Sequence, residues 1–204
     1  KSRIQCRYRA DRGEYMGFPH AFEILQEYEI KRDGFYHTVT VTNFSEQNMP
    51  LFLGFHTTFN TLFAKNSKEK DMRVFADISE EYDLNMKVNY LPTGVKPCFD
   101  AVSTALSDGT YHPFDGKISR HYRGNGQMLI ADIGNGLRVV YENDEKYGFR
   151  LIYNGGSDGY ICLEPQTCLV GCQNSPFSRE EAGFDFLQAG EGKTYCSKIF
   201  LKKI

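Results

Sequence analysis

The order of hydrophobic and polar residues along this chain is mostly that of β-strands, in which every second side chain faces the same way. Segments of this character, bounded by Gly, Pro or charged residues, lie at 22–31, 36–42, 127–133, 137–142, 147–153, 160–163 and 194–202. The turn sequences Arg32-Asp33-Gly34 and Gly134-Asn135-Gly136 each join two of these segments, so both predict a β-hairpin.

Three other segments complete the predicted architecture. Residues 51–59 are largely apolar, a composition that predicts a strand buried on both faces. Residues 66–73 are polar and charged and predict an exposed loop or a single helical turn. The stretch 83–114 holds three Pro and two Gly, so we expect a long connection with short strands or turns. Many short strands with Gly and Pro between them indicate an all-β sandwich or barrel.

Composition argues against several classes of partner. The chain of 204 residues, 41% of them hydrophobic, is long enough for one domain with a real core. Its net charge is −2 and no basic run is present, so nucleic acid is not expected as a partner. No apolar stretch approaches the roughly 20 residues that cross a bilayer, and residues 1–20 lack the apolar segment of a signal peptide. We therefore expect no membrane partner and a cytoplasmic location.

The cysteines are expected to be free, reduced thiols, because a chain of this length does not need disulfides to be stable. They are Cys6, Cys98, Cys162, Cys168, Cys172 and Cys196. Cys168 and Cys172 stand four residues apart, but no paired His or Cys lies at the spacing of zinc ligands. We therefore predict no metal site.

Two ionisable residues in apolar surroundings are candidates for chemistry. His56 lies between two phenylalanines, where it is either a core histidine or a proton donor and acceptor near neutral pH. Glu164 ends the apolar run 160–163, and glutamate is seldom buried unless it is paired or functional. Pro165 favours an extended conformation at Glu164 and is expected to end the regular strand there. The carboxylate is either a base whose pKa burial raises, or the partner of a neighbouring loop.

His56 and Glu164 belong to longer motifs. The positions in these motifs are Asn43, Ser45 and Pro50, then Gly54, His56 and Phe59, then Glu164 to Thr167, and Asn174. In order and in their wide spacing, they resemble the aldose 1-epimerase family. Residues 18–23 also resemble the family's entry to this region, and the resemblance runs from roughly Tyr8 to the C-terminus.

The resemblance implies a galactose mutarotase-like fold, which is an all-β antiparallel β-sandwich, or supersandwich. It implies a single domain over 1–204 that corresponds to the C-terminal portion of the family's usual chain. That chain's N-terminal strands, and an Arg and a His that contact the sugar, would be absent. The implied function is that of a cofactor-independent isomerase, an aldose 1-epimerase (mutarotase), that interconverts the α and β anomers of a free monosaccharide.

The resemblance also implies roles for individual residues. Glu164 would take the proton of the anomeric hydroxyl and His56 would give a proton to the ring oxygen. The ring would then open, C1 would rotate about the C1–C2 bond, and the ring would close on the opposite face. The implied substrate-binding residues are Ser119, Arg120, His121, Gln166 and Asn174. Ser119 stands where the family usually has Asp, and Thr58 stands where it often has an aromatic residue.

Three alternative functions stay open. Lys117, Arg120 and Arg123 lie close together in the sequence and would suit a sugar phosphate as the substrate of a mutarotase. A catalytically inactive carbohydrate-binding domain is the second alternative, favoured by Ser119. A structural sandwich from a larger glycan-processing enzyme is the third, because fold alone does not determine function. Strand edges without partners also predict a homodimer.

Overall fold

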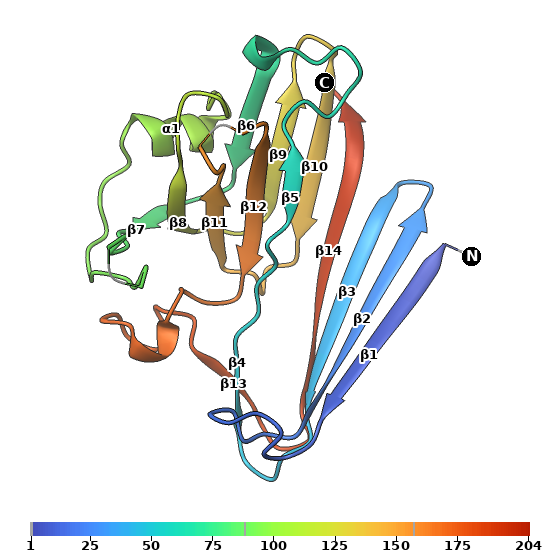
Figure 1. Ribbon diagram of the computed structural model, residues 1–204, viewed down its shortest axis with the longest axis vertical. Helices are drawn as coiled ribbons and strands as arrows, with labels where there is room; N and C mark the ends of the chain where they lie inside the picture. The colour runs from blue at the N-terminus through green and yellow to red at the C-terminus, as the bar shows by residue number, and fades with distance from the viewer. Residues whose placement is uncertain (1, 88, 157) are drawn as a thin grey trace.

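The chain forms two large antiparallel β-sheets and one small sheet in the computed structural model, which describes residues 2–87, 89–156 and 158–204 (Figure 1). The seven-stranded sheet has the order β1-β2-β3-β14-β10-β9-β6. Its strands are β1 (Arg3–Ala10), β2 (Phe22–Lys31), β3 (Gly34–Asn43), β6 (Met72–Ala76), β9 (Gln127–Asp132), β10 (Leu137–Asn143) and β14 (Gly192–Lys203). Both predicted hairpins, β2–β3 and β9–β10, are confirmed.

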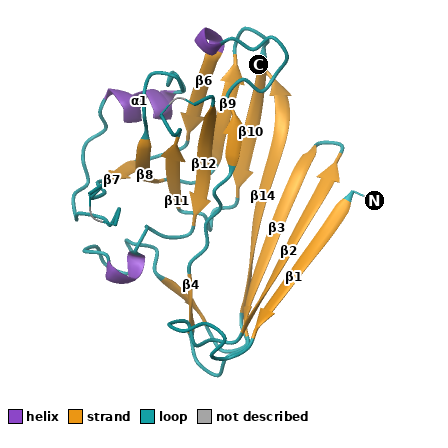
Figure 2. Cartoon of the chain, viewed as in Figure 1, coloured by secondary structure: helices purple, strands orange, loops and turns teal. Residues whose placement is uncertain are grey.

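The five-stranded sheet lies across from one end of the seven-stranded sheet and has the order β5-β12-β11-β8-β7 (Figure 1). Its strands are β5 (Thr58–Asn60), β7 (Glu80–Tyr82), β8 (Ser119–Arg123), β11 (Phe149–Tyr153) and β12 (Tyr160–Gln166). The small sheet pairs β4 (Met49–Leu51) with β13 (Asp185–Leu187). Strands therefore dominate the structure, as Figure 2 shows, and the predicted all-β antiparallel architecture is confirmed.

Helix α1 (Ala101–Asp108) lies in the stretch 83–114, for which the sequence predicts only short strands or turns. The Asp100 side chain caps it by accepting hydrogen bonds from two backbone N–H groups, and Gly109 ends it with a φ of 80°. The short 3-10 helices are η1 (Glu69–Asp71) and η2 (Cys172–Asn174). Within the described part of the chain, no helix has the length and hydrophobicity that a membrane crossing requires.

The main hydrophobic core lies between the two large sheets. The seven-stranded sheet contributes Met72, Val74, Ala76, Met128, Ile130 and Tyr141. The five-stranded sheet contributes Tyr122, Ile152, Ile161 and Leu163, and α1 contributes Leu106. Full burial of one such aliphatic side chain contributes about 1.5–3 kcal/mol, so this core holds β8, β11 and β12 firmly in position.

The other end of the seven-stranded sheet is covered much less. Strand β1 is exposed at every residue except the last, and β1 to β3 extend away from the five-stranded sheet (Figure 1). The inner side of β3 packs on a second core that it shares with β4 and β13. The members of this core include Val39, Val41, Met49, Leu51, Leu187 and Tyr195. The predicted homodimer, which these open strands would suit, stays a prediction.

Residues 52–60 correct the prediction of a strand buried on both faces. Exposed and half-buried residues alternate strictly along this segment, which follows β4 and runs into β5. Phe55 packs against the second core, whereas the side chain of His56 is 66% exposed. His56 is therefore not a core histidine, because the apolar run buries only one of its two sides.

Strand β12 corrects a second expectation, since it continues through Pro165 to Gln166. The Pro165 carbonyl accepts a hydrogen bond from Phe55 N at 3.2 Å. The proline nitrogen therefore faces the irregular segment 53–57, and its missing N–H does not interrupt the pairing with β11. The cysteines agree with prediction, because all six are free thiols.

Candidate active site

Alternate residues of β12 point to opposite faces of the five-stranded sheet. Ile161 and Leu163 lie in the main core, so Cys162, Glu164 and Gln166 lie on the other face, which we call the site face. The register aligns site-face residues in rows across β8, β11 and β12. These rows are Ser119, Tyr153 and Cys162; His121, Leu151 and Glu164; and Arg123, Phe149 and Gln166.

The segment that precedes β5 brings His56 against the site face of β12. Leu163 N donates to Thr57 O at 2.9 Å, and Phe55 N donates to Pro165 O at 3.2 Å. These two backbone hydrogen bonds flank His56 on both sides and align it with the middle row. The position of the imidazole is therefore set by β-type pairing, although this segment is not a regular strand.

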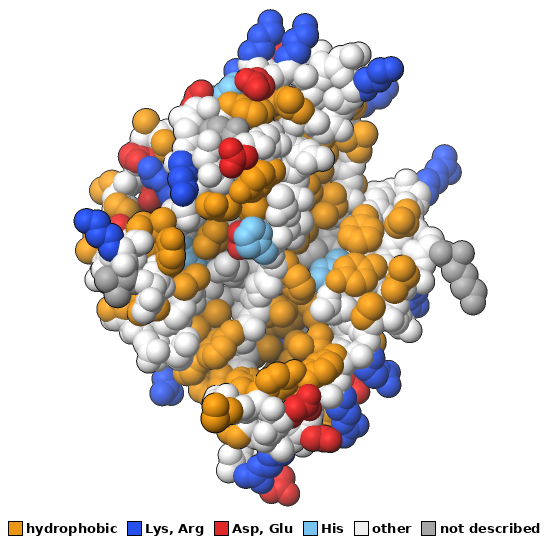
Figure 3. All heavy atoms as spheres, in the orientation of Figure 1, with side chains coloured by type: hydrophobic (Ala, Val, Ile, Leu, Met, Phe, Trp, Pro, Cys, Tyr) orange, Lys and Arg blue, Asp and Glu red, His pale blue; other side chains and the backbone are white. Residues whose placement is uncertain are grey.

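His56 and Glu164 are in contact, with Nε2 of the imidazole 3.4 Å from Oε1 of the carboxylate. The His56 side chain is 66% exposed, whereas the Glu164 side chain is only 8% exposed. Burial raises the pKa of Glu164 above its ordinary value, while His56 and a hydrogen bond from Gln166 act in the opposite direction. Figure 3 shows a histidine against an acidic side chain near the middle of this face of the molecule. The pair thus joins a buried carboxylate to a solvent-exposed imidazole.

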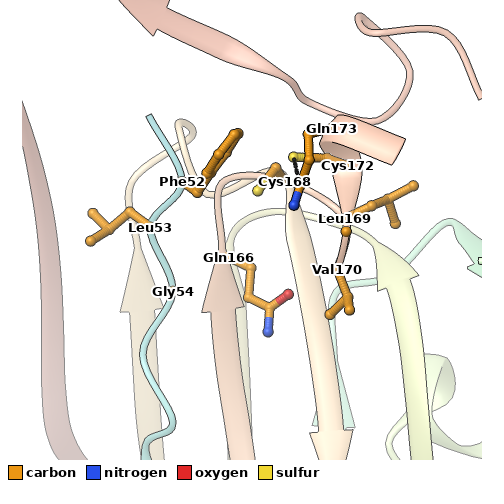
Figure 4. A pocket seen from close by; sticks show the side chains of 10 residues that line it. Phe52, Leu53, Gly54, Gln166, Cys168, Leu169, Val170, Cys172 and Gln173 are labelled. Atoms are coloured by element: carbon orange, nitrogen blue, oxygen red, sulfur yellow. Dashed lines mark hydrogen bonds between the residues drawn. The ribbon is translucent and has the colours of Figure 1, made fainter. Parts of the chain in front are cut away.

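A cavity of about 250 Å³ lies along the same two segments as the pair, and its lining contains neither His56 nor Glu164. Its lining includes Gly54 and Gln166, each two residues away from a member of the pair. Figure 4 shows the Gln166 side chain, which lines the cavity, with Leu53 and Gly54 on one side and Val170 on the other. At position 54 an added Cβ would lie 3.0 Å from Gln166 Cγ, so glycine lets the two segments approach closely without displacing the Gln166 side chain. The close approach of these two segments therefore shapes the cavity wall.

The structure brings Gln166 and His121, two of the predicted substrate-binding residues, close to the pair. The Gln166 amide interacts with both Glu164 and His121. His121 is fully buried, and burial lowers its pKa to about 4, with Gln166 partly opposing this effect. Its ring nitrogens make no hydrogen bond of normal geometry with the described residues. His121 therefore lies behind Gln166, which is the residue that reaches the cavity.

Arg120 lies on the face opposite to its neighbours Ser119 and His121, as strand alternation requires. Its Nη2 is 2.7 Å from Asp100 Oδ2, and its Nη1 is 3.2 Å from Glu81 Oε1. These ion pairs tie Arg120 to the start of α1. The structure therefore does not bring Arg120 to the His56–Glu164 pair, although the sequence predicts it among the substrate-binding residues.

Ser119 and Asn174, the remaining predicted substrate-binding residues, lie at the margins. Ser119 is half-buried on the site face, one row away from Glu164 and opposite Tyr153. Asn174 is exposed at the end of η2, next to Gln173, which lines the cavity. Neither residue is in contact with the pair, so both would meet a ligand only at its periphery.

Two residues beside the pair are not among the site residues predicted from the sequence. The Tyr153 ring lies 6.5 Å from the His56 ring, centroid to centroid, at an interplanar angle of 77°. Cys162 is buried, and its Sγ, the His56 ring nitrogen and a Glu164 oxygen all lie within 4.8 Å of one another. The sequence does carry a signal for Cys162, because residues two apart on a strand share a face. These three residue types are able to hold a metal ion.

The chain matches the family described as aldose 1-epimerase over residues 2–198. Similar solved structures include a galactose mutarotase-like protein from Clostridium acetobutylicum, with 24% identity and a TM-score of 0.90, covering 99% of this chain and 63% of that one. A proposed aldose 1-epimerase from Escherichia coli K12 has 17% identity and a TM-score of 0.78, covering 100% and 66%. Galactose 1-epimerase from Lactobacillus acidophilus NCFM has 14% identity and a TM-score of 0.64, covering 98% and 63%. The chain spans less than two thirds of each protein, and at these identities the likeness shows a shared fold.

Proposed function

The chain belongs to the aldose 1-epimerase family, and we propose that it interconverts the α and β anomers of a free aldose by general acid–base catalysis. The observation that carries this proposal is the 3.4 Å contact between His56 Nε2 and Glu164 Oε1 beside a cavity. Opening a sugar ring requires a base at the anomeric hydroxyl and an acid at the ring oxygen. The pair supplies one group for each oxygen.

In the proposed reaction, ionised Glu164 removes the proton of the anomeric hydroxyl, and the C1 carbonyl forms as the bond from C1 to the ring oxygen breaks. Protonated His56 gives its proton to the departing ring oxygen, which becomes a free hydroxyl. After rotation about the C1–C2 bond, neutral His56 takes this proton back as the oxygen attacks C1. Glu164 then returns its proton to the carbonyl oxygen, so both groups regain their starting states.

Glu164 is buried and His56 is exposed, and this difference supports their proposed roles. Burial raises the pKa of Glu164, which makes its carboxylate a stronger base than an exposed glutamate. The 3.4 Å contact is longer than a normal hydrogen bond of about 2.7–3.2 Å. Because His56 is 66% exposed, its ring is free to turn away from Glu164 when a sugar binds.

The cavity supports a small neutral ligand. Its volume of about 250 Å³ is below the roughly 300–1,000 Å³ of sites that hold drug-sized ligands, which suits a monosaccharide. The Gln166 amide can both donate to and accept from sugar hydroxyls, and it lies in the cavity next to Glu164. We assign His121 to a positioning role, since it lies behind Gln166 and is fully buried.

A sugar phosphate is disfavoured as substrate, because Arg120 and Arg123, two of the three cations that would bind it, already have anionic partners. Arg120 contacts Asp100 on the other face of the sheet. Arg123 Nε lies 3.3 Å from Glu80 Oε2. A phosphate would have to displace these carboxylates, so a neutral aldose is the better candidate.

Polarimetry of freshly dissolved α-glucose and α-galactose tests the proposal. The protein is expected to accelerate mutarotation above the buffer rate, and Glu164→Gln is expected to lower kcat/KM about 10²- to 10⁴-fold. Glu145→Gln is a matched control, because Glu145 is an exposed carboxylate in a loop. Wild-type protein that binds either sugar by calorimetry without raising the mutarotation rate would instead be the carbohydrate-binding domain considered above.

A further inference from the structure

Three side chains with different metal-binding atoms meet at the proposed catalytic pair. Cys162 and Glu164 stand two residues apart on the site face of β12, and His56 lies across from them. The Cys162 thiol, a Glu164 oxygen and a His56 ring nitrogen all lie within 4.8 Å of one another. Both β12 side chains are buried, so two of the three groups are already fixed by the packing of the sheet.

The distances suit a tetrahedral cation. Zinc bonds of about 2.0–2.3 Å to sulfur, nitrogen and oxygen place neighbouring ligand atoms about 3.3–3.8 Å apart. The 3.4 Å separation of His56 Nε2 and Glu164 Oε1 already has this value. The separations of Cys162 Sγ from the other two atoms are at most 4.8 Å. The exposed His56 ring is free to turn toward Cys162, and a small shift of the Cys162 or Glu164 side chain would close the gap between those two.

From this geometry we propose that His56, Cys162 and Glu164 bind a thiophilic divalent cation of the zinc class, and that the bound cation blocks the acid–base pair. The binding claim stands on these contacts alone, whereas the inhibition claim rests on the proposed function. Thiolate, imidazole and carboxylate together favour zinc or cobalt over magnesium or calcium, which prefer oxygen ligands throughout. Three protein ligands would leave a fourth coordination position for water.

One neighbour of Cys162 supports a thiolate ligand, whereas burial raises the pKa of the free thiol. Thr58 Oγ1 lies 3.2 Å from Cys162 Sγ, so its hydroxyl can donate a hydrogen bond to the sulfur once the metal has displaced the thiol proton. A thiolate and a carboxylate would together balance the charge of a divalent ion. A sugar would be excluded, since the cation would engage the two groups that act on the sugar's oxygens.

Cobalt titration tests the binding claim without any measurement of activity. Protein freed of metal by EDTA and then desalted is titrated with Co²⁺, and the thiolate-to-cobalt charge-transfer absorption is recorded. We expect one equivalent to bind, Zn²⁺ to displace it, and Cys162→Ser to abolish the charge-transfer band and weaken binding at least about 100-fold. Cys172→Ser is the matched control, because Cys172 is also buried but lies near Cys168, away from the pair.

The cobalt titration distinguishes binding at Cys162 from binding at another thiol. A band that persists in Cys162→Ser, or that disappears in Cys172→Ser, would assign the metal to another thiol and overturn the proposal, as would the absence of any band. Circular dichroism checks that each variant is folded, and Cys162→Ala replaces Cys162→Ser if the serine variant is not. Binding confirmed in this way would stand even if the protein had no mutarotase activity.

The inhibition claim is tested by polarimetry with added Zn²⁺. Inhibition is expressed relative to the metal-free rate of the same variant. We expect Zn²⁺ to inhibit the wild type competitively with the aldose, and to inhibit Cys162→Ser at least about 100-fold less potently. Equal inhibition of both proteins, or full wild-type activity with zinc bound, would overturn the inhibition claim.

Discussion

On one face of the five-stranded sheet, β12 carries Ile161 and Leu163, which are at most 1% exposed and lie in the main core. On the other face, the same strand carries Glu164 and Gln166, a buried carboxylate and an amide beside a cavity. The two faces belong to the same strand, and successive residues alternate between them. One face therefore stabilises the fold, while the other bears groups that are costly to bury.

This division has an energetic consequence. Burial of Glu164 and His121 disfavours their charged forms, so the site face contributes less stability than a fully apolar face would. The core face offsets this cost and also holds the backbone rows that align His56 with Glu164. At neutral pH, substitutions on the core face should therefore change stability, and those on the site face should mainly change activity.

The largest expected effect is on the core face. Leu163→Ala would leave a cavity between the two large sheets, and we expect it to lower the free energy of unfolding by about 3 kcal/mol. Gln166→Ala, on the site face of the same strand, is expected to cost about 1 kcal/mol or less. Urea unfolding measures both values. Equal losses would contradict the proposed division of labour between the faces.

His121 is expected to give an effect of similar size, as a loss of stability in acid. Its pKa is about 4 in the folded protein and about 6.5 in an unfolded chain, so the unfolded state binds the proton more readily. Stability should therefore fall as pH decreases from about 6.5 to 4, by about 3 kcal/mol in total. His121→Phe removes the titrating group and should flatten this part of the profile, measured by urea unfolding from pH 7 to 4.5. If the stability of both proteins fell in parallel with decreasing pH, the loss would not come from His121.

Much of the fold could be predicted from the sequence, because its signals are local. Alternation together with turn residues is sufficient to define the β2–β3 and β9–β10 hairpins. Helix α1 is missed because its capping signals, Asp100 and Gly109, lie in a stretch interrupted by three Pro. The segment 52–60 is misassigned because its apolar composition hides a strict alternation of exposed and half-buried residues.

The site could be predicted less completely. His56 and Glu164 are identified as the acid–base pair through the family resemblance, since the residues alone leave a structural role open for each, and their roles stay proposals. Arg120 is adjacent in the sequence to Ser119 and His121, which lie on the site face. The sequence does not determine which face of the sheet each of them occupies until the pairing of β8 is known. Cys162 was overlooked because its partner His56 is distant in the sequence. The predicted cytoplasmic location is a further proposal that the fold does not test.

A smaller effect is expected at Arg120. Arg120→Gln would remove its ion pairs with Asp100 and Glu81 at the start of α1, and we expect a loss of about 1 kcal/mol because Asp100 is largely exposed. The KM for an aldose should not change, because Arg120 lies on the face away from the cavity. Gln166→Ala should instead raise KM. A raised KM in Arg120→Gln would mean that Arg120 reaches the sugar after all.

The pH dependence of catalysis should show the smallest difference. Burial raises the pKa of Glu164, so the acid limb of kcat/KM should lie above the value of about 4.3 for an exposed glutamate. Activity is lost as pH falls through this limb, because protonated Glu164 cannot accept the anomeric proton. Gln166→Leu removes a hydrogen bond that favours the carboxylate, so it should move the limb to still higher pH. Polarimetry in the presence of EDTA, which keeps metal ions from the pair, measures the acid limb of the wild type and of Gln166→Leu. A limb that moved to lower pH in this variant would show that Gln166 does not stabilise the Glu164 carboxylate, and that burial alone does not determine its basicity.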